Sequence, residues 1–150
     1  MSRAFVKETD GDDTLPERPV SEHPNFVTAS GLAAMDAELA RLGDDLAAAG
    51  DDRAAKARIG RDLRYWQTRR ATADLIPPPA DTDTVQFGSA VTIVRDDGRV
   101  QTFRIVGEDE ADPPRGSISY VSPLARALLK KAVGDVVTVA GQETEIQAIA

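Results

Sequence analysis

Two adjacent carboxylates, Asp51 and Asp52, follow Gly50 at the centre of a region with helical periodicity. Carboxylate oxygens are the ligands that a hard cation such as Mg²⁺ prefers, so the pair is a candidate for helping to hold a metal ion. The ordinary alternative is a solvated turn in which an aspartate caps the following helix. The residue types alone leave both interpretations open.

Basic side chains gather directly after this pair. They fall in one stretch of helical periodicity and comprise Arg53, Lys56, Arg58, Arg61, Arg64, Arg69 and Arg70. Such a face can follow the phosphates of a nucleic acid or an acidic protein wall. The candidates for this contact are Arg53, Lys56, Arg61 and Arg64. A plain solvated helix face is the alternative that the charge pattern also permits.

A third candidate site lies near residue 122, where Ser122 and Pro123 are expected to open a short helix. The apolar residues that follow favour packing on a sheet, which leaves the loop at Ser122 and Pro123 free to bind a partner. We include the flanking residues Val121 and Arg126 in this candidate docking surface.

The inventory of reactive side chains excludes most catalytic sites. The chain has 150 residues, no cysteine and a single histidine, His23. The absence of cysteine excludes a disulfide framework and a Cys-ligated metal site. The one histidine lies in a segment that we expect to be a loose tail, so we expect neither a Ser/His/Asp triad nor a His-ligated catalytic metal site. Gly98, Gly107 and Gly116 do not form a dinucleotide fingerprint, and the sequence has no P-loop. We therefore expect a protein that is not itself an enzyme and has no intrinsic cofactor.

The charge balance favours a protein partner. With 18 basic and 25 acidic residues, the formal net charge is -7, which argues against a chain that finds duplex nucleic acid by its bulk charge. No stretch reaches the roughly 20 apolar residues of a membrane span, and the N-terminus lacks the apolar core of a signal peptide. We expect a cytoplasmic protein with no membrane partner.

Apolar periodicity predicts the helices that carry the first two candidate sites. The large apolar residues recur every three or four positions at Leu32, Met35, Leu39, Leu42 and Leu46, and again at Ile59, Leu63 and Trp66. This spacing predicts two helices, of which the first is capped by Ser30, or by Thr28 if the helix starts earlier, and ends near Gly50. A short connector would fold the second helix back on the first. We therefore expect an antiparallel two-helix coiled-coil hairpin, or finger, over residues 28–76.

The regions on either side of the finger have different patterns. Residues 1–27 hold three basic and six acidic residues with few large apolar ones, so we expect a disordered acidic and Pro-rich tail. Three consecutive prolines from Pro77 end the second helix, and we assign residues 77–84 to a linker. Residues 85–150 show an apolar period of two, which predicts a small antiparallel sheet. The expected fold class is α+β.

The sheet region divides into short strands with one helix between them. The expected strands are residues 90–94, 100–106, 118–121, 136–139 and 144–149. Asp96, Asp97 and Gly98 supply the turn of the first hairpin, and Gly141 supplies that of the last. The helix is expected to run from Ser122 through Leu129.

Four segments resemble the bacterial Gre-type (GreA/GreB) transcription elongation factors, with the C-terminal half nearer to GreB. They are VTASGLAAMDAEL at 27–39, RIGRDLRYW at 58–66, DDGRVQTFRIVGEDEAD at 96–112 and SYVSPLARALLKKAVGD at 119–135. Together they touch most of the chain after Val27. The last two are long and specific, whereas the tail before Val27 is not covered.

This resemblance implies an N-terminal coiled-coil finger and a C-terminal domain with an FKBP-like fold. In the family, the C-terminal domain docks at the rim of the RNA polymerase secondary channel, and the finger enters the channel, where contact with nascent RNA is expected. Acidic fingertip residues help hold Mg²⁺ in the polymerase active site, which cleaves backtracked RNA. By this resemblance, Asp51 and Asp52 are metal-assisting tip residues, and residues 121–123 with Arg126 form the docking surface.

The chain departs from the family pattern at three places. Relatives carry a Glu and then an Asn starting three residues after the tip Asp, whereas this chain has Ala54 and Ala55. Each arm is shorter than the family's by roughly ten residues, about 15 Å of helix. Val121 stands where relatives often have Asp or Asn. The resemblance therefore implies a polymerase-binding regulator in which channel occlusion, in competition with full-length Gre factors, is favoured over cleavage stimulation.

Two other classes of function stay open at this point. An FKBP-like domain can act as a peptidyl-prolyl isomerase, for which Phe87, Phe103 and Tyr120 are the available cleft aromatics. A pure interaction module would instead pair the finger with another coiled coil. Because Arg70 interrupts the apolar seam, we expect a monomer.

Overall fold

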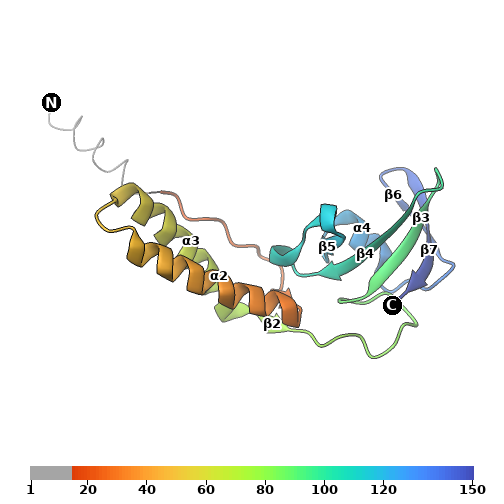
Figure 1. The fold of residues 1–150 in the computed structure, drawn as a ribbon. Coiled ribbons are helices and arrows are strands. Elements are labelled where there is room, and N and C mark those ends of the chain that lie inside the picture. Colours follow the sequence, from red (N-terminus) through yellow and green to blue (C-terminus); the bar gives the residue numbers. More distant parts are fainter. Residues whose placement is uncertain (1–14) are drawn as a thin grey trace. The chain divides into compact units, whose positions relative to one another are not determined.

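The computed structural model describes residues 15–150 (Figure 1), and these divide into two compact units. The described part of the first unit consists of residues 15–22 and 32–73, and the second unit consists of residues 23–31 and 74–150. The first residues of the finger and the expected linker therefore group with the C-terminal unit. Among residues 15–150, none of the helices has the length and hydropathy needed to cross a bilayer.

The first unit is built on the expected pair of helices. They are α2 (Ala29–Ala48) and α3 (Arg53–Thr72), of 20 residues each, which corresponds to about 30 Å of helix. Met35 and Leu42 are buried at the centre of the apolar seam, with 2% and 3% of their surface exposed. The three-and-four spacing thus places the predicted face of α2 against its partner helix.

Charged residues also join the two helices. The guanidinium Nε of Arg70 donates to Asp36 Oδ1 at 2.8 Å. Arg69 on α3 is 1% exposed and is the largest fully buried side chain. Arg70, which we expected only to interrupt the seam, therefore forms an ion pair between α2 and α3.

Residues 15–27 differ from the disordered tail that we expected. Residues 15–22 form an extended segment that contacts α3 through the ion pairs of Glu17 and Arg18. Phe26–Val27 form strand β1, which pairs in parallel with β2 (Asp74–Leu75), and Val27 is 1% exposed. The ion pairs of Glu17 and Arg18 and the buried side chain of Val27 hold this segment in place, although its composition alone predicted a disordered tail. Residues 1–14 of the expected tail lie outside the described residues.

The second unit contains a five-stranded sheet. Its strands are β3 (Ala90–Arg95), β4 (Val100–Val106), β5 (Ser117–Ser119), β6 (Val136–Val139) and β7 (Gln142–Ile149), in the order β5-β4-β3-β7-β6. All neighbouring pairs are antiparallel except β4 and β5, which are parallel. The sheet is therefore mixed, in contrast to the antiparallel sheet that we expected.

The parallel pair results from the connection between β4 and β5. Two short 3-10 helices, Glu108–Glu110 and Pro113–Arg115, carry the chain back alongside Arg104 of β4 before β5 begins. The two clusters of carboxylates and prolines in this connection give no periodic signal, so the sequence pattern did not indicate a crossover of this kind.

A short helix, α4 (Pro123–Leu128), completes the core of the second unit. Ala125 and Leu128 on α4 are fully buried. The core cluster comprises Val85, Val91, Ile93, Ile105, Ile118, Ala125, Leu128, Val137 and Ile146. Burial of these two α4 residues fixes the helix, and with it the loop at its start, on the sheet.

Candidate functional site

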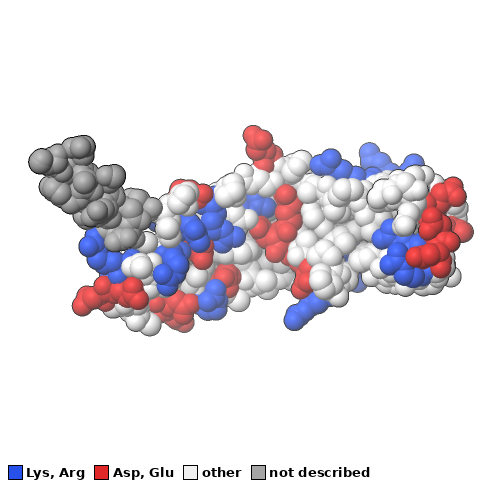
Figure 2. All heavy atoms as spheres, turned by 90° about the horizontal axis from the view of Figure 1, so that it is seen from above, with Lys and Arg blue, Asp and Glu red and all other residues white. Residues whose placement is uncertain are grey.

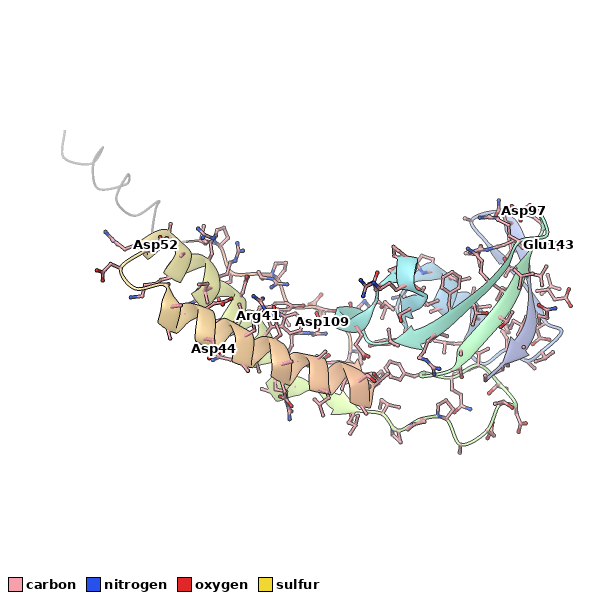
Figure 3. The ribbon with its side chains drawn as sticks, viewed as in Figure 1. Arg41, Asp44, Asp52, Asp97, Asp109 and Glu143 are labelled. Atoms are coloured by element: carbon pink, nitrogen blue, oxygen red, sulfur yellow. The ribbon has the colours of Figure 1, made fainter. Side chains whose placement is uncertain are left out.

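The turn between α2 and α3 assigns different roles to the two tip aspartates. Gly50 adopts a left-handed conformation with φ of +59°, which reverses the chain. Asp52 is the N-cap of α3, and its Oδ1 accepts a hydrogen bond from the Ala55 N–H at 3.1 Å. Figure 3 shows Asp52 at this turn. The carboxylate of Asp52 is therefore engaged as a helix cap, which was the ordinary alternative for this pair.

Beyond the cap, the first turn of α3 supplies no further carboxylate. The first turn of this helix contains no acidic residue, and Ala54 and Ala55 occupy it. Asp51 is exposed and is the second carboxylate of the turn. Within residues 15–150, no three side chains of the types His, Cys, Asp and Glu are grouped closely enough to hold a metal ion. Any cation at this tip would need most of its ligands from another molecule.

Several residues of the predicted basic face pair with carboxylates. Arg64 donates from Nε and Nη2 to both carboxylate oxygens of Glu17, with the shortest contact at 2.7 Å. This hydrogen bond lowers the pKa of Glu17 below its ordinary value and raises that of Arg64. Arg61 Nε lies 3.5 Å from Asp62 Oδ1. Arg64 and Arg61, both predicted to contact phosphates, thus already lie against carboxylates of the chain.

The other two predicted basic residues, Arg53 and Lys56, are exposed in the first turns of α3. Figure 2 shows Lys and Arg spheres interspersed with Asp and Glu spheres over the helices rather than a continuous positive surface. Because opposite charges alternate at short range, the field of this region falls off quickly with distance. The positively charged surface is therefore confined to short stretches of α3.

The candidate docking surface is presented by a rigid helix start. Ser122 is the N-cap of α4, and its Oγ accepts from the Ala125 N–H at 3.3 Å. Pro123 occupies the first helical position and is exposed, as is Arg126. Val121 is half-buried, and its N–H donates to Ser119 Oγ at 3.2 Å. Pro123 and Arg126 are thus the residues of this surface best placed to meet a partner.

Two of the three candidate isomerase aromatics are packed in a cluster. Phe87 and Tyr120 lie 5.7 Å apart between ring centroids, and Phe26 lies 6.0 Å from Phe87 and 5.2 Å from Tyr120. The Tyr120 hydroxyl donates to the Pro24 carbonyl at 2.5 Å. These rings contact one another, so they serve as packing rather than as the walls of an open cleft.

One polar contact at the start of α2 was not indicated by the sequence. The Glu110 carboxylate accepts from the Thr28 N–H at 2.9 Å, from the Thr28 hydroxyl, and from the Gly107 N–H at 3.2 Å. Thr28 Oγ1 in turn accepts from the Gly31 N–H at 3.0 Å, so Thr28 rather than Ser30 caps α2. A Cβ on Gly31 would overlap the Glu110 side chain. Gly31, in the first turn of α2, was the sequence feature that could have indicated the close approach of Glu110 to this helix.

Comparison with known proteins gives consistent results. A protein-family model described as transcription elongation factor, GreA/GreB, C-term, matches residues 80–149. The transcription elongation factor GreB of Neisseria meningitidis serogroup B is 37% identical over 125 residues, which cover 82% of this chain and 74% of that protein. The transcription elongation factor GreA of Ralstonia nicotianae is 40% identical over 148 residues, covering 91% and 89% of the two chains.

Among solved structures, the crystal structure of GreA factor homolog 1 from Thermus thermophilus aligns with 83% of this chain and 97% of that one. The identity is 22% and the TM-score is 0.42.

Proposed function

The chain belongs to the GreA/GreB family of transcription elongation factors, and from this premise we propose that it binds RNA polymerase and regulates transcript elongation. The family acts on the polymerase and is not itself enzymatic, which agrees with the absence of cysteine and the single histidine in this sequence. A partner of this kind places the chain in the bacterial cytoplasm.

In this proposal the second unit carries the docking surface at the rim of the polymerase secondary channel. Pro123 and Arg126 are exposed on α4, while Ala125 and Leu128 of the same helix are buried. A helix fixed in this way presents its exposed residues with little loss of conformational entropy on binding. Ser122 supports the surface by capping the helix.

The finger then enters the channel, and its tip determines what the chain does there. The observation that carries the proposal is that Asp52 caps α3 through the Ala55 N–H while the first turn of that helix has no other acid. Holding a catalytic metal for RNA hydrolysis needs carboxylate oxygens directed at the ion. Asp51 is the one tip carboxylate not used as the cap. We infer that the finger occupies the channel with little or no stimulation of cleavage.

The length of the finger supports the same conclusion. Each helix has 20 residues, and arms shorter than the family's by roughly ten residues lose about 15 Å of reach. A misplacement of even about 1 Å at a reacting centre is costly to catalysis. A channel occluder that competes with full-length Gre factors is therefore favoured over a cleavage factor.

The other two classes of function have less support. The clustered rings of Phe26, Phe87 and Tyr120 leave the isomerase without its aromatic cleft. The seam residues Met35 and Leu42 are buried within the hairpin, so a coiled-coil partner would find no apolar seam there. We expect a monomer that acts alone on the polymerase.

The test uses stalled, backtracked elongation complexes. The purified chain is added with and without a cleavage-competent Gre factor, and the length of the RNA is followed. The proposal predicts intact RNA with the chain alone and slower cleavage by the added factor. Shortened RNA from the chain alone would overturn it. If such cleavage appears, Asp51→Asn identifies the tip as its source, with Asp44→Asn on the last turns of α2 (Figure 3) as a control of equal charge change.

A further inference from the structure

An extended strap, defined here as residues 15–22, lies on α3 within the first unit (Figure 1). We propose that this strap is an intramolecular competitor that masks the Arg64 region of the finger and must leave before that region can bind phosphates. The inference deepens the proposed function, because it concerns the same finger, but its first tests do not involve the polymerase.

The central contact of the strap imitates a phosphate. Glu17 receives three hydrogen bonds from Arg64, at 2.7, 2.9 and 3.0 Å, in the two-pronged geometry that a guanidinium offers to a carboxylate or a phosphate. The carboxylate occupies the fork of the guanidinium group. A phosphodiester and Glu17 therefore compete for the same Nε and Nη2 donors of Arg64.

The next residue of the strap covers the neighbouring aromatic side chain. The Arg18 guanidinium carbon lies 3.9 Å from the centroid of the Tyr65 ring and 5.9 Å from that of Trp66. Arg18 Nη1 also donates to Asp62 Oδ1 at 3.4 Å. Aromatic faces beside arginines are the surfaces on which single-stranded bases stack. The strap thus covers the Arg64 guanidinium group and the Tyr65 ring, which are the two groups that a single-stranded nucleic acid would contact.

The residue types of the strap are typical of a segment that a competing ligand can displace. Pro16 and Pro19 flank the pair Glu17–Arg18 and favour extended backbone, which lets the segment follow the helix without forming one. Its one large apolar residue over the groove, Val20, remains 43% exposed. The groove between strap and helix has a volume of about 450 Å³. Leu15, the other large apolar residue of the strap, is half-buried, so ion pairs and the Arg18–Tyr65 contact supply much of the adhesion.

The ion pairs themselves are exposed. The side chains of Glu17 and Arg64 are 61% and 55% exposed, and those of Arg18 and Asp62 are 36% and 32% exposed. Contacts of this kind are weak and are screened by salt. They suffice within one chain because the tether keeps the local concentration of the strap high. A polyanion with several phosphates can still displace the strap.

The first experiment detects release of the strap. Trp66 is the only tryptophan of the chain and lies beside Arg18 of the strap, so its quenching by acrylamide reports whether Arg18 is in place. Glu17→Gln removes the charge that holds Arg64, and we expect greater quenching in this variant. Glu22→Gln, an exposed residue at the end of the strap, makes the same change in net charge and should leave quenching unaltered. Equal quenching in wild type and both variants would overturn the proposal.

The second experiment measures what the strap excludes. Binding of a short fluorescein-labelled single-stranded RNA to the full chain is followed by anisotropy at low ionic strength. We expect Glu17→Gln to bind about two- to fivefold more tightly than Glu22→Gln, as the strap pair is a weak surface contact. The same Glu17→Gln change in an Arg64→Gln background should have no effect, because the ligand site and the pair are both lost. An equal gain in RNA affinity in Glu17→Gln and Glu22→Gln would mean a general charge effect and would refute the masking role of the strap.

A third comparison separates this inference from the proposed function. If Glu17→Gln tightens RNA binding but the chain does not bind polymerase, the masking role of the strap is supported and the proposed function is refuted. If the chain binds polymerase while Glu17→Gln and Glu22→Gln bind RNA equally, the proposed function stands and the masking role falls. Tighter binding of Glu17→Gln to an acidic peptide but not to RNA would overturn the phosphate assignment.

Discussion

Replacing Glu110 by Gln should destabilise the protein, because this carboxylate joins the start of α2 to the segment after β4. It accepts from the Thr28 N–H at 2.9 Å, from the Thr28 hydroxyl, and from the Gly107 N–H at 3.2 Å. Its negative charge also lies at the N-terminus of a helix of 20 residues, where a helix dipole favours an anion. Glutamine keeps the shape of the side chain and removes the charge.

The size of the effect follows from the bonds that change. The two N–H donors share Oε2, so the amide oxygen of glutamine can still accept both, but without charge assistance. The Thr28 hydroxyl donates to Oε1 and must turn away from an amide nitrogen. Hydrogen bonds to charged groups contribute about 1.5–3 kcal/mol and neutral ones about 0.5–1.5 kcal/mol. We therefore expect a loss of about 2 kcal/mol in the free energy of unfolding.

Urea denaturation followed by circular dichroism measures this loss, and thermal unfolding checks it. For a chain of this size, about 2 kcal/mol corresponds to a fall in Tm of about 4–8 °C. Glu143→Gln is the control, because Glu143 is exposed on β7 (Figure 3) and the change in net charge is the same. A surface change of this type usually alters stability by less than about 0.5 kcal/mol.

If the two variants are equally stable, the reasoning is refuted, and the Glu110 contacts do not contribute in solution. A further variant, Thr28→Ser, keeps the hydroxyl that donates to Glu110 and accepts from the Gly31 N–H. It should retain most of the stability. A loss for this variant as large as that for Glu110→Gln would mean that the methyl group of Thr28, and not the hydrogen-bond network, holds the helix start.

Three further changes test the tip, the docking surface and the strap. Pro123→Glu should abolish polymerase binding in a pull-down while the circular dichroism spectrum stays unchanged; binding at the wild-type level would refute the docking assignment. Asp52→Ala removes the N-cap of α3 and should lower the free energy of unfolding by about 1 kcal/mol in urea titrations. A stability equal to wild type would show that the cap does not contribute. Because Arg64 lowers the pKa of Glu17 from its ordinary value of 4.5, the ion pair is intact above that pH and is lost as the pH falls through the lowered pKa. Acrylamide quenching of Trp66 should therefore stay constant down to about pH 4.5 and rise only as the pH falls below it, and a rise that begins above about pH 4.5 would contradict the pairing.

The elements that position the candidate sites could be predicted because their signals are local. The three-and-four spacing from Leu32 to Leu46 specifies one face of a helix wherever that helix packs. Gly50 reverses the chain because it can adopt a positive φ. Ser122 before Pro123 starts α4 for similarly local reasons. The two helices, the hairpin of β3 and β4, and that of β6 and β7 are confirmed.

The mixed character of the sheet depends on a connection without periodicity. Residues 107–116 contain two short 3-10 helices, and their path determines whether β5 runs with or against β4. Alternation of apolar residues reports which face of a strand is buried and carries no information about its direction. The sequence pattern therefore predicted the strand but not its parallel pairing.

The sequence by itself determined the inventory of this protein: two tip aspartates, a basic second helix, a Ser-Pro helix start at Ser122, no cysteine and a single histidine. The tertiary structure decided which of these groups are already paired. Arg64 is paired with Glu17, 47 residues away, and Thr28 with Glu110, 82 residues away. Such pairs depend on the path of the whole chain, and a short-range electrostatic contact leaves no periodic trace in the residues that make it.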